Sequence, residues 1–424
     1  MMRQCSLAGV RWLSMTSLAI VACCSCTGGS GPARAGMANS DSGRPATNLT
    51  NLLWRREVVF DEATRLYSKM VTLFFDPKTG RQVTGINLVL LSRFSDGLAV
   101  AQEVDDGPYG YVDQAGHAVI AFRYCYAEPF NDGRAVVTIK MGDDQSRVHG
   151  LIDRAGKWIV QPGLYDKLGM YRDGCCPFKI GKLWGLLDGN GKIIVRPQYK
   201  YTRYGQPTFH AGLAAFWDKA GRLVYIDSKG RTKFVAPSGT LCAYEFNNDR
   251  AMVEIAGGRQ VSRQDASDGS GPDGTFSGAK FGYIDLVGRL IIAPAYSAAG
   301  PFSEGLAPVS PGSIYPFQDD TEPMAIGSPS NEKELWGFID VSGNIAIPFT
   351  FARVGSFSEG LARVRKGGRW GYIDKKGHTV VPCEYEWARD FRNGFAEVWC
   401  DDKVVYIDRT GRIVVHTDLS TVTF

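Results

Sequence analysis

Residues 369–377, with the sequence RWGYIDKKG, decide the fold of this chain. Tyr372 and Asp374 alternate with Ile373, as residues on the two faces of a β-strand do. An aspartate at the start of a turn can accept a backbone N–H two residues on, and a glycine at its end takes a positive φ without steric cost. The stretch therefore predicts a strand that runs into a tight hairpin turn.

The same pattern occurs eight times along the chain. Each copy places a glycine three residues after an aspartate, and successive aspartates are 40, 35, 39, 58, 55, 34 and 34 residues apart. Self-similarity at such a period is typical of solenoids, propellers and arrays. The eight turn residues are Asp113, Asp153, Asp188, Asp227, Asp285, Asp340, Asp374 and Asp408.

Two further half-motifs accompany each turn. Phe-Ser-Asp/Glu-Gly-Leu-Ala precedes the strand, as at 94–99 and 357–362, and aliphatic residues with Pro and an aromatic follow the turn, as at 194–199. The proline is expected to close a strand at a sheet edge, because it has no N–H to donate. A glycine after the first aromatic recurs in six copies and is replaced by Val224 and Val405 in the others. Glycine inside a strand indicates that another backbone or ring approaches closely.

This pattern resembles the WG-repeat family of bacterial proteins, which is named for the Trp-Gly pairs seen at 184–185, 336–337 and 370–371. The resemblance covers roughly residues 70 to 416. It implies a β-repeat protein of mostly unassigned function, with no catalytic residue set to carry over.

The expected fold is all-β, a closed β-propeller of seven or eight blades, because the unit length suits a four-stranded blade. An open β-solenoid of stacked hairpins is the alternative. Residues 52–93 are interpreted as an irregular lead-in with a degenerate hairpin at 71–80. Part-units at both ends of the repeat region could pair to close a ring.

The N-terminal region predicts export. Residues 1–22 are interpreted as a lipoprotein-type signal peptide, since Arg3 and Arg11 precede a short apolar run that ends in a lipobox-like sequence with Cys23 as the lipidated residue. Cleavage near Ala35 is the alternative, and an uncleaved anchor is a third reading. Residues 23–51 have the composition of a flexible tether, and residues 52–424 form the repeat domain.

Two insertions, at 257–280 and 311–335, interrupt the repeat domain. Insertions in repeat proteins map to loops, often on the binding face, although surface decoration without function is the more common outcome. The letters G-x-G-x-x-G occur at 269–274, but no strand precedes them and no helix follows, so they read as loop.

Composition excludes several functions. Loss of residues 1–22 lowers the formal net charge from +4 to +2, and no basic run supports nucleic-acid binding. Six cysteines follow the leader region without a C-x-x-C motif, so free thiols are expected, with no metal site and no cofactor. No catalytic motif is present, and the repeated aspartates are interpreted as turn caps.

Three functions remain open. The first is a non-catalytic binding scaffold of the cell envelope, held by a lipid anchor and facing a protein or glycan partner. The second is an enzyme with its site in a propeller channel, which requires polar side chains unique to single repeats. The third is a purely structural envelope spacer.

Overall fold

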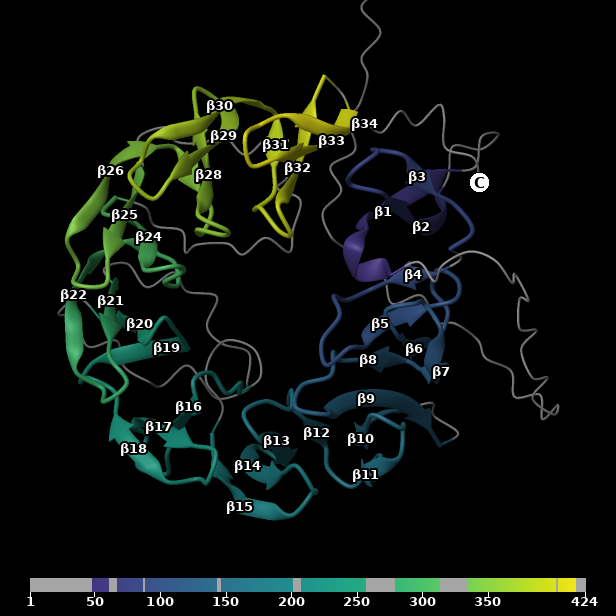
Figure 1. The fold of residues 1–424 in the computed structure, drawn as a ribbon. Coiled ribbons are helices and arrows are strands. Elements are labelled where there is room, and N and C mark those ends of the chain that lie inside the picture. The colour runs from purple at the N-terminus through teal and green to yellow at the C-terminus, as the bar shows by residue number, and fades with distance from the viewer. Residues whose placement is uncertain are drawn as a thin grey trace, which may run out of the picture.

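The computed structural model describes residues 48–60, 67–86, 88–142, 146–200, 207–256, 279–312, 335–401 and 403–416. Within these ranges the chain forms one short 3₁₀-helix, η1 (Leu49–Asn51), and nine antiparallel sheets. The sheets follow one another around a ring, as blades of a propeller (Figure 1). We number the blades 1 to 9 in chain order.

Each blade is one contiguous segment of the chain. Blade 1 contains β1 (Leu53–Phe60), β2 (Tyr67–Phe75) and β3 (Gln82–Val83); blade 2 contains β4 (Val89–Leu90), β5 (Ala99–Gln102), β6 (Tyr109–Val112) and β7 (Ala118–Tyr124); blade 3 contains β8 (Tyr126–Ala127), β9 (Arg134–Met141), β10 (Ser146–Asp153) and β11 (Trp158–Val160). Blade 4 contains β12 (Lys167–Leu168), β13 (Cys175–Ile180), β14 (Leu183–Asp188) and β15 (Ile193–Tyr199); blade 5 contains β16 (Leu213–Trp217), β17 (Leu223–Asp227) and β18 (Thr232–Val235), with Lys200 bridged to Trp217 in the place of a first strand.

The remaining blades are four-stranded. Blade 6 contains β19 (Thr240–Asn247), β20 (Arg250–Ile255), β21 (Lys280–Ile284) and β22 (Leu290–Tyr296); blade 7 contains β23 (Ala298–Ala299), β24 (Leu306–Ser310), β25 (Trp336–Asp340) and β26 (Ile345–Phe351). Blade 8 contains β27 (Arg353–Val354), β28 (Leu361–Lys366), β29 (Arg369–Asp374) and β30 (Thr379–Tyr385); blade 9 contains β31 (Trp387–Ala388), β32 (Phe395–Cys400), β33 (Lys403–Asp408) and β34 (Ile413–His416).

The closed-propeller prediction is confirmed, but the blade number is wrong. Eight aspartate turns lie in blades 2 to 9, and the predicted lead-in supplies a ninth blade. Its turn, from Asp76 to Gly80, is one residue longer than the repeated spacing and therefore does not match the Asp-x-x-Gly pattern. The geometry is nevertheless equivalent, since Lys78 N–H donates to Asp76 Oδ1 at 2.8 Å and Gly80 has a φ of +68°. The solenoid alternative is excluded by the closed ring (Figure 1).

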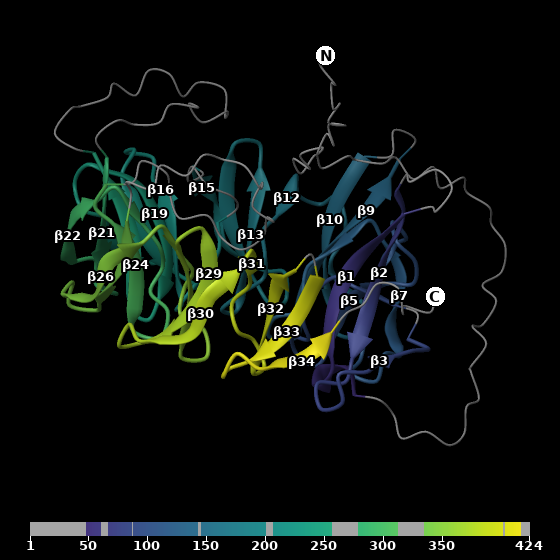
Figure 2. The same ribbon diagram turned by 90° about the horizontal axis from the view of Figure 1, so that it is seen from above.

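Strand direction gives the ring two different faces (Figure 2). The turns between first and second strands and between third and fourth strands emerge on one face, which we call the turn face. The loops between second and third strands emerge on the other, which we call the loop face. The insertion segments 257–278 and 313–334 lie outside the described residues; the strands that flank them, β20 and β21 and then β24 and β25, have their facing ends at the loop face.

The recurrent glycine and proline belong to one feature, a bulge in the outermost strand. In blade 8, Tyr372 pairs with Val381 and Trp370 with Tyr385, so three residues including Pro382 lie opposite Gly371. A Cβ on Gly371 would lie 2.5 Å from the Val381 carbonyl oxygen. The proline thus lies within the edge strand and does not close it, contrary to expectation.

The two valine exceptions follow from the same geometry. Val224 and Val405 pair directly with Val235 and His416, so the outer strand makes no bulge at that point and leaves room for a side chain.

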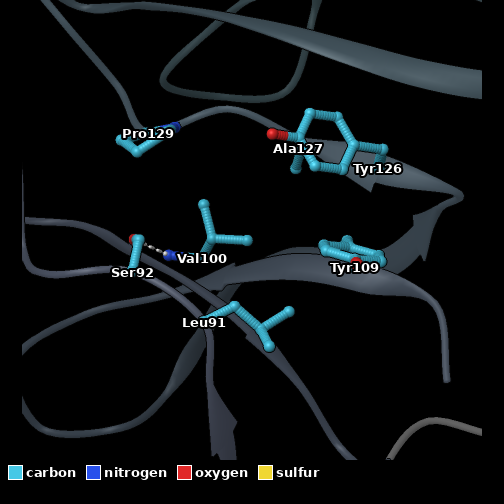
Figure 3. Close-up of a pocket in the computed structure, with 7 residues that line it drawn as sticks. All are labelled: Leu91, Ser92, Val100, Tyr109, Tyr126, Ala127 and Pro129. Carbon is cyan, nitrogen blue, oxygen red and sulfur yellow. Dashed lines mark hydrogen bonds between the residues drawn. The ribbon is translucent and has the colours of Figure 1, made fainter. Parts of the chain in front are cut away.

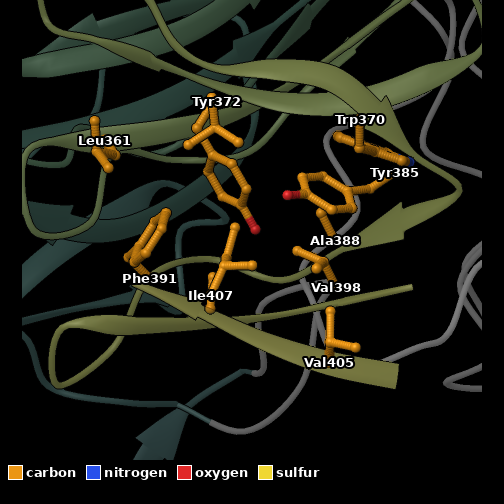
Figure 4. Close-up of a cluster of buried hydrophobic side chains, with 11 residues drawn as sticks. Leu361, Trp370, Tyr372, Tyr385, Ala388, Phe391, Val398, Val405 and Ile407 are labelled. Atoms are coloured by element: carbon orange, nitrogen blue, oxygen red, sulfur yellow. The ribbon is translucent and has the colours of Figure 1, made fainter. Parts of the chain in front are cut away.

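The core lies between neighbouring blades (Figure 4). Tyr372 of blade 8 packs edge-on against Phe391 of blade 9, with ring centroids 4.7 Å apart. The Tyr372 hydroxyl donates to the Arg389 carbonyl oxygen of blade 9 at 2.6 Å. Tyr111 and Tyr283 make the corresponding contacts to their following blades. The aromatic of one half-motif therefore binds the phenylalanine of the next, which fixes the order of the blades.

Candidate functional site

The eight repeated aspartates lie at the turns between third and fourth strands, on the turn face. In each copy Oδ1 accepts two backbone N–H bonds; Asp374 takes them from Lys376 and His378, both at 2.9 Å. The second oxygen often binds the side chain four residues on, as Asp227 does with Arg231 Nε at 2.8 Å. Each carboxylate is therefore already hydrogen-bonded within its own turn. The other seven copies show the same pair of backbone bonds.

A second set of acidic residues links the blades on the turn face. The turn between first and second strands has two consecutive residues with positive φ, such as Glu359 (55°) and Gly360 (82°). Glu359 Oε2 accepts the Gly394 N–H of the next blade at 2.7 Å, and Glu304 Oε2 accepts that of Gly360 at 3.0 Å. The repeated acidic position of this half-motif thus serves blade-to-blade contact.

Function is better sought where equivalent positions differ between blades. One such position is the second-strand residue that pairs with the Trp position of the third strand, together with its partner on the first strand. We call these pairs the inner rim; they lie toward the loop face. In blades 2 to 9 they are Val89/Gln102, Tyr126/Thr138, Lys167/Lys179, Lys200/Trp217, Cys242/Glu254, Ala298/Ser310, Arg353/Arg365 and Trp387/Trp399.

The inner rim is not among the residues predicted from the sequence, although the sequence contains a signal for it. In every copy the second-strand member lies four residues after the residue that follows the Phe-x-x-Gly turn or its equivalent, which is Tyr-x-x-Gly at 171–174 and Phe-x-x-Asp at 246–249. That offset carries Gln, Thr, Lys, Trp, Glu, Ser, Arg and Trp in turn. This position therefore keeps the same place in each blade but changes its residue type, unlike the repeated aspartates, glycines and aromatics.

Two blades present like charges at the rim. Lys167 pairs with Lys179 in blade 4, and Arg353 pairs with Arg365 in blade 8. All four side chains are half-buried. Burial, and then the neighbouring charge of Arg365, lower the pKa of the Arg353 guanidinium. Directly opposed like charges weaken an antiparallel pair, while Arg365 Nε also donates to the Gly368 carbonyl oxygen at 3.1 Å.

A cavity of about 220 Å³ opens at the rim between blades 2 and 3 (Figure 3). Tyr109 and Tyr126 pack together at one side of it, with ring centroids 5.7 Å apart. The Tyr126 hydroxyl donates to Glu128 Oε1 at 3.2 Å, and burial raises the pKa of the Glu128 carboxyl. Burial, and then the Glu128 charge, raise the pKa of Tyr126 to about 12. The other lining residues are Leu91, Ser92, Val100, Ala127 and Pro129.

Four of the histidines have local partners. His117 and His378 lie beside the aspartates of their own turns, and His149 lies 3.1 Å from the Thr138 hydroxyl. His210 Nε2 is 2.5 Å from Glu245 Oε2 and 3.0 Å from Arg172 Nη1. The described residues contain no group of three or more His, Cys, Asp or Glu side chains arranged to hold a metal ion.

The six cysteines after the leader are all described, and no disulfide joins them. Cys175 and Cys176 are adjacent but point to opposite faces of their blade, into the cores shared with blades 5 and 3. Burial raises the pKa of both thiols, so they are poor nucleophiles at neutral pH.

The export predictions fall on residues that the structure does not describe. Cys23, Ala35, the signal segment 1–22 and most of the tether 23–51 lie in the undescribed range 1–47. Among the described residues no helix has the length and hydropathy needed to cross a membrane.

The sequence profile described as "WG containing repeat" matches the chain six times, at residues 109–140, 150–184, 184–204, 281–310, 336–370 and 370–403. This protein belongs to the WG-repeat family. Each match begins within the third strand of a blade and continues through the fourth strand of that blade, so it includes the aspartate turn.

Known structures resemble the WG-repeat ring in fold alone. A eukaryotic initiation factor aligns with a TM-score of 0.50 at 9% identity, over 85% of this chain and 94% of the other. BamB from Moraxella catarrhalis aligns with a TM-score of 0.33 at 10% identity, over 85% and 96% of the two chains. No curated protein sequence matches the chain.

Proposed function

We propose that this WG-repeat protein is a non-catalytic binding scaffold of the cell envelope, tethered through Cys23 and presenting the loop face of its ring to a protein or glycan partner. The observation that carries the proposal is that some repeat positions serve the fold whereas others vary between blades. The recurrent aspartates, glycines and aromatics are engaged in turns, bulges and blade contacts. The inner rim keeps its register but changes its chemistry from blade to blade.

Rigid repeat arrays that vary at one surface are typical of recognition proteins. The ring supplies a fixed spacing, and the rim residues supply specificity. The leader composition and Cys23 support placement in the envelope, with cleavage near Ala35 and release as the alternative.

The test is a cross-linked pull-down from envelope extracts with the protein as cells process it. We expect the wild type to retain an envelope component that a variant of four rim residues, K167Q/K179Q/R353Q/R365Q, does not retain. The matched control is K157Q/K192Q/K229Q/K376Q, which removes four exposed charges from the turn face. Retention of nothing by the wild type contradicts the scaffold and favours a structural spacer.

Localisation is tested separately with Cys23→Ala. Loss of the protein from the membrane fraction is expected if Cys23 is lipidated, whereas unchanged fractionation contradicts the anchor and favours cleavage near Ala35.

An enzyme acting at the ring centre is the second candidate. It is favoured by the same observation, since polar rim residues unique to single blades are the feature that such a site requires. The two candidates differ in their product: a scaffold retains its partner unchanged, whereas an enzyme releases a partner of altered mass.

A further inference from the structure

We propose that the turn face of the ring docks on the surface of an anionic phospholipid bilayer, with the apolar turn tips of blades 6 and 7 inserted among the lipid headgroups. A turn tip here means the residues between the aspartate and the glycine of the turn that joins a third strand to a fourth. The inference rests on the proposed envelope tether and deepens it, because it states which face of the ring meets the membrane.

The turn tips of blades 6 and 7 are aliphatic. Blade 6 has Leu286 and Val287 at its tip and blade 7 has Val341, and all three side chains are exposed. Blades 2 to 5, 8 and 9 have polar, charged or small residues at the equivalent positions. Exposed turn positions favour polar residues, and an apolar residue there adds nothing to the core between blades. Exposed apolar tips on two adjacent blades therefore indicate a contact surface.

The first residues of the fourth strands extend this apolar surface. Leu290 and Ile291 begin β22, Ile345 begins β26, and all three are exposed. A Cβ on Gly343, in the turn of blade 7, would lie 3.2 Å from the Ile292 side chain of blade 6, so the two turns are neighbours. Leu290 lies two residues before Ile292 and points to the same side, toward the blade 7 turn. The exposed aliphatic residues of the two blades thus form one patch.

The charged residues at the turn tips are all cations. No tip in the nine described turns carries Asp or Glu, whereas six exposed cations lie there: Lys78, Arg154, Lys229, Lys375, Lys376 and Arg409. Lys229 and Lys376 belong to blades 5 and 8, so they lie on either side of the apolar patch. Lys375 also pairs with Glu304 at 3.0 Å. The tips therefore combine an apolar patch with a ring of positive charge.

The described chain begins on the same face. The Leu49 N–H donates to the Gln114 carbonyl oxygen at 2.7 Å, and Gln114 lies at the tip of the blade 2 turn. Cys23 precedes Asn48 by 25 residues, and a flexible linker of that length spans roughly 25–30 Å on average. A lipid on Cys23 therefore holds the turn face near the bilayer. Blades 6 and 7 lie across the ring from this junction (Figure 1), so the tether and the patch hold opposite sides of the ring.

A bilayer accounts for both the cations and the apolar tips. Its headgroup phosphates bind lysine and arginine, and its acyl boundary accepts aliphatic side chains. A soluble polyanion would meet only the cations, and a protein partner would not account for the tether junction on the same face. The turns are spread along one face of the ring (Figure 2), which suits a broad surface and not a groove.

The test adds the protein as cells process it to vesicles of phosphatidylglycerol and phosphatidylethanolamine whose acyl chains carry bromine, which quenches tryptophan on contact. V287W places a probe on the turn face, and V104W places one on the loop face. Val287 and Val104 are 61% and 63% exposed, so both variants should fold as the wild type does. After the wild-type signal is subtracted, we expect the V287W tryptophan to lose most of its fluorescence and the V104W tryptophan to lose none.

Two further measurements test the chemistry of the contact. Raised salt, or phosphatidylcholine in place of phosphatidylglycerol, should reduce the quenching of V287W, because the cations then lose their anionic partner. Adding V341S/I345S to V287W should also reduce it, whereas adding V104S/I180S, which changes two exposed aliphatic residues of the loop face, should not. Melting temperatures should stay equal, since all four residues are exposed, and this separates loss of docking from loss of fold.

Three outcomes overturn the inference. Equal quenching of V287W and V104W would mean that the ring has no preferred face, and quenching of neither would mean that the ring stands away from the bilayer. Quenching of V287W that V341S/I345S leaves unchanged and soluble polyphosphate abolishes would assign the cations to a soluble polyanion.

The docking and the scaffold function can fail separately. If the envelope pull-down succeeds and V287W is not quenched, the scaffold function stands and only the docking of the turn face fails. If V287W is quenched and the pull-down retains nothing, the docking stands and the scaffold function fails.

Discussion

At the scale of single residues, the repeated glycine is set by the bulge opposite it. Gly371 has no room for a Cβ, which would lie 2.5 Å from the Val381 carbonyl oxygen and 2.7 Å from the Cys383 N. We expect Gly371→Ala to destabilise the protein by roughly 1–3 kcal/mol, because the backbone of the edge strand must shift. The matched control is Gly312→Ala, where a Cβ meets nothing within 4 Å. Equal denaturation midpoints for the two variants would contradict the bulge explanation.

The turn carboxylates make the fold sensitive to acid. The His378 N–H bond is the largest cause that lowers the pKa of Asp374, and the Asn344 side-chain bond is the largest that lowers the pKa of Asp340. A depressed folded-state pKa gives stability that is fully present above the unfolded value of about 3.9 and is lost as pH falls through the folded value.

We therefore expect the melting temperature to fall steeply below about pH 4. D340N/D374N should flatten that fall, because the variant has two fewer protons to bind on unfolding. Asp390 and Glu128 act in the opposite direction, since burial raises the pKa of each. An acid-induced loss of stability centred well above pH 5 would contradict the assignment to the turn carboxylates, whose pKa values are lowered in the folded state.

At the scale of elements, the blade interface between β28 and β31 contains an ion pair. Arg363 Nε lies 2.9 Å from Asp390 Oδ1, and the two side chains are 12% and 9% exposed. Burial raises the pKa of the Asp390 carboxyl, although the Arg363 charge opposes it. Removing one partner leaves a buried group without its counter-charge, which is more damaging than removing both.

We expect Arg363→Met to cost about 3–5 kcal/mol and R363M/D390N to recover most of that loss. A denaturant titration of both variants gives the comparison. If the double variant were as unstable as Arg363→Met alone, the pair would matter through packing on Trp370, whose ring lies 5.1 Å from the Arg363 guanidinium.

The blade count shows which elements can be predicted from sequence. The strand, turn and glycine of blades 2 to 9 follow from local steric rules. They can therefore be predicted wherever the repeated residues occur in the sequence. Blade 1 was predicted only as a hairpin, because its Asp76–Gly80 turn is one residue longer and it lacks the Phe-x-x-Gly half-motif. The inner rim was missed because its residues have no shared chemistry; only the register of the assembled sheet brings them into one row.

At the scale of the whole molecule, the ring closes without a shared strand. Every described blade comes from one segment of chain, and among the described residues no strand of blade 1 pairs with a strand of blade 9. Leu53, Leu73 and Phe75 of blade 1 pack on Tyr406 and Val415 of blade 9. The expected pairing of chain ends is therefore replaced, within the described residues, by face packing. Within the described residues this seam is the one interface between neighbouring blades that the chain does not cross directly from one blade to the next.

The seam predicts where the ring opens first. Phe75 is 4% exposed and lies 6.3 Å from the Tyr406 ring centroid. We expect Phe75→Ala to cost about 3–5 kcal/mol and to speed amide hydrogen exchange in both blade 1 and blade 9, because loss of this contact frees two blades at once. Phe338→Ala, between blades 7 and 8, removes a ring of equal size that is fully buried. It should destabilise the protein without selective exchange at the seam. Exchange that rises equally in all blades of the Phe75→Ala variant would mean that the ring unfolds as one unit and that the seam is as strong as the other interfaces.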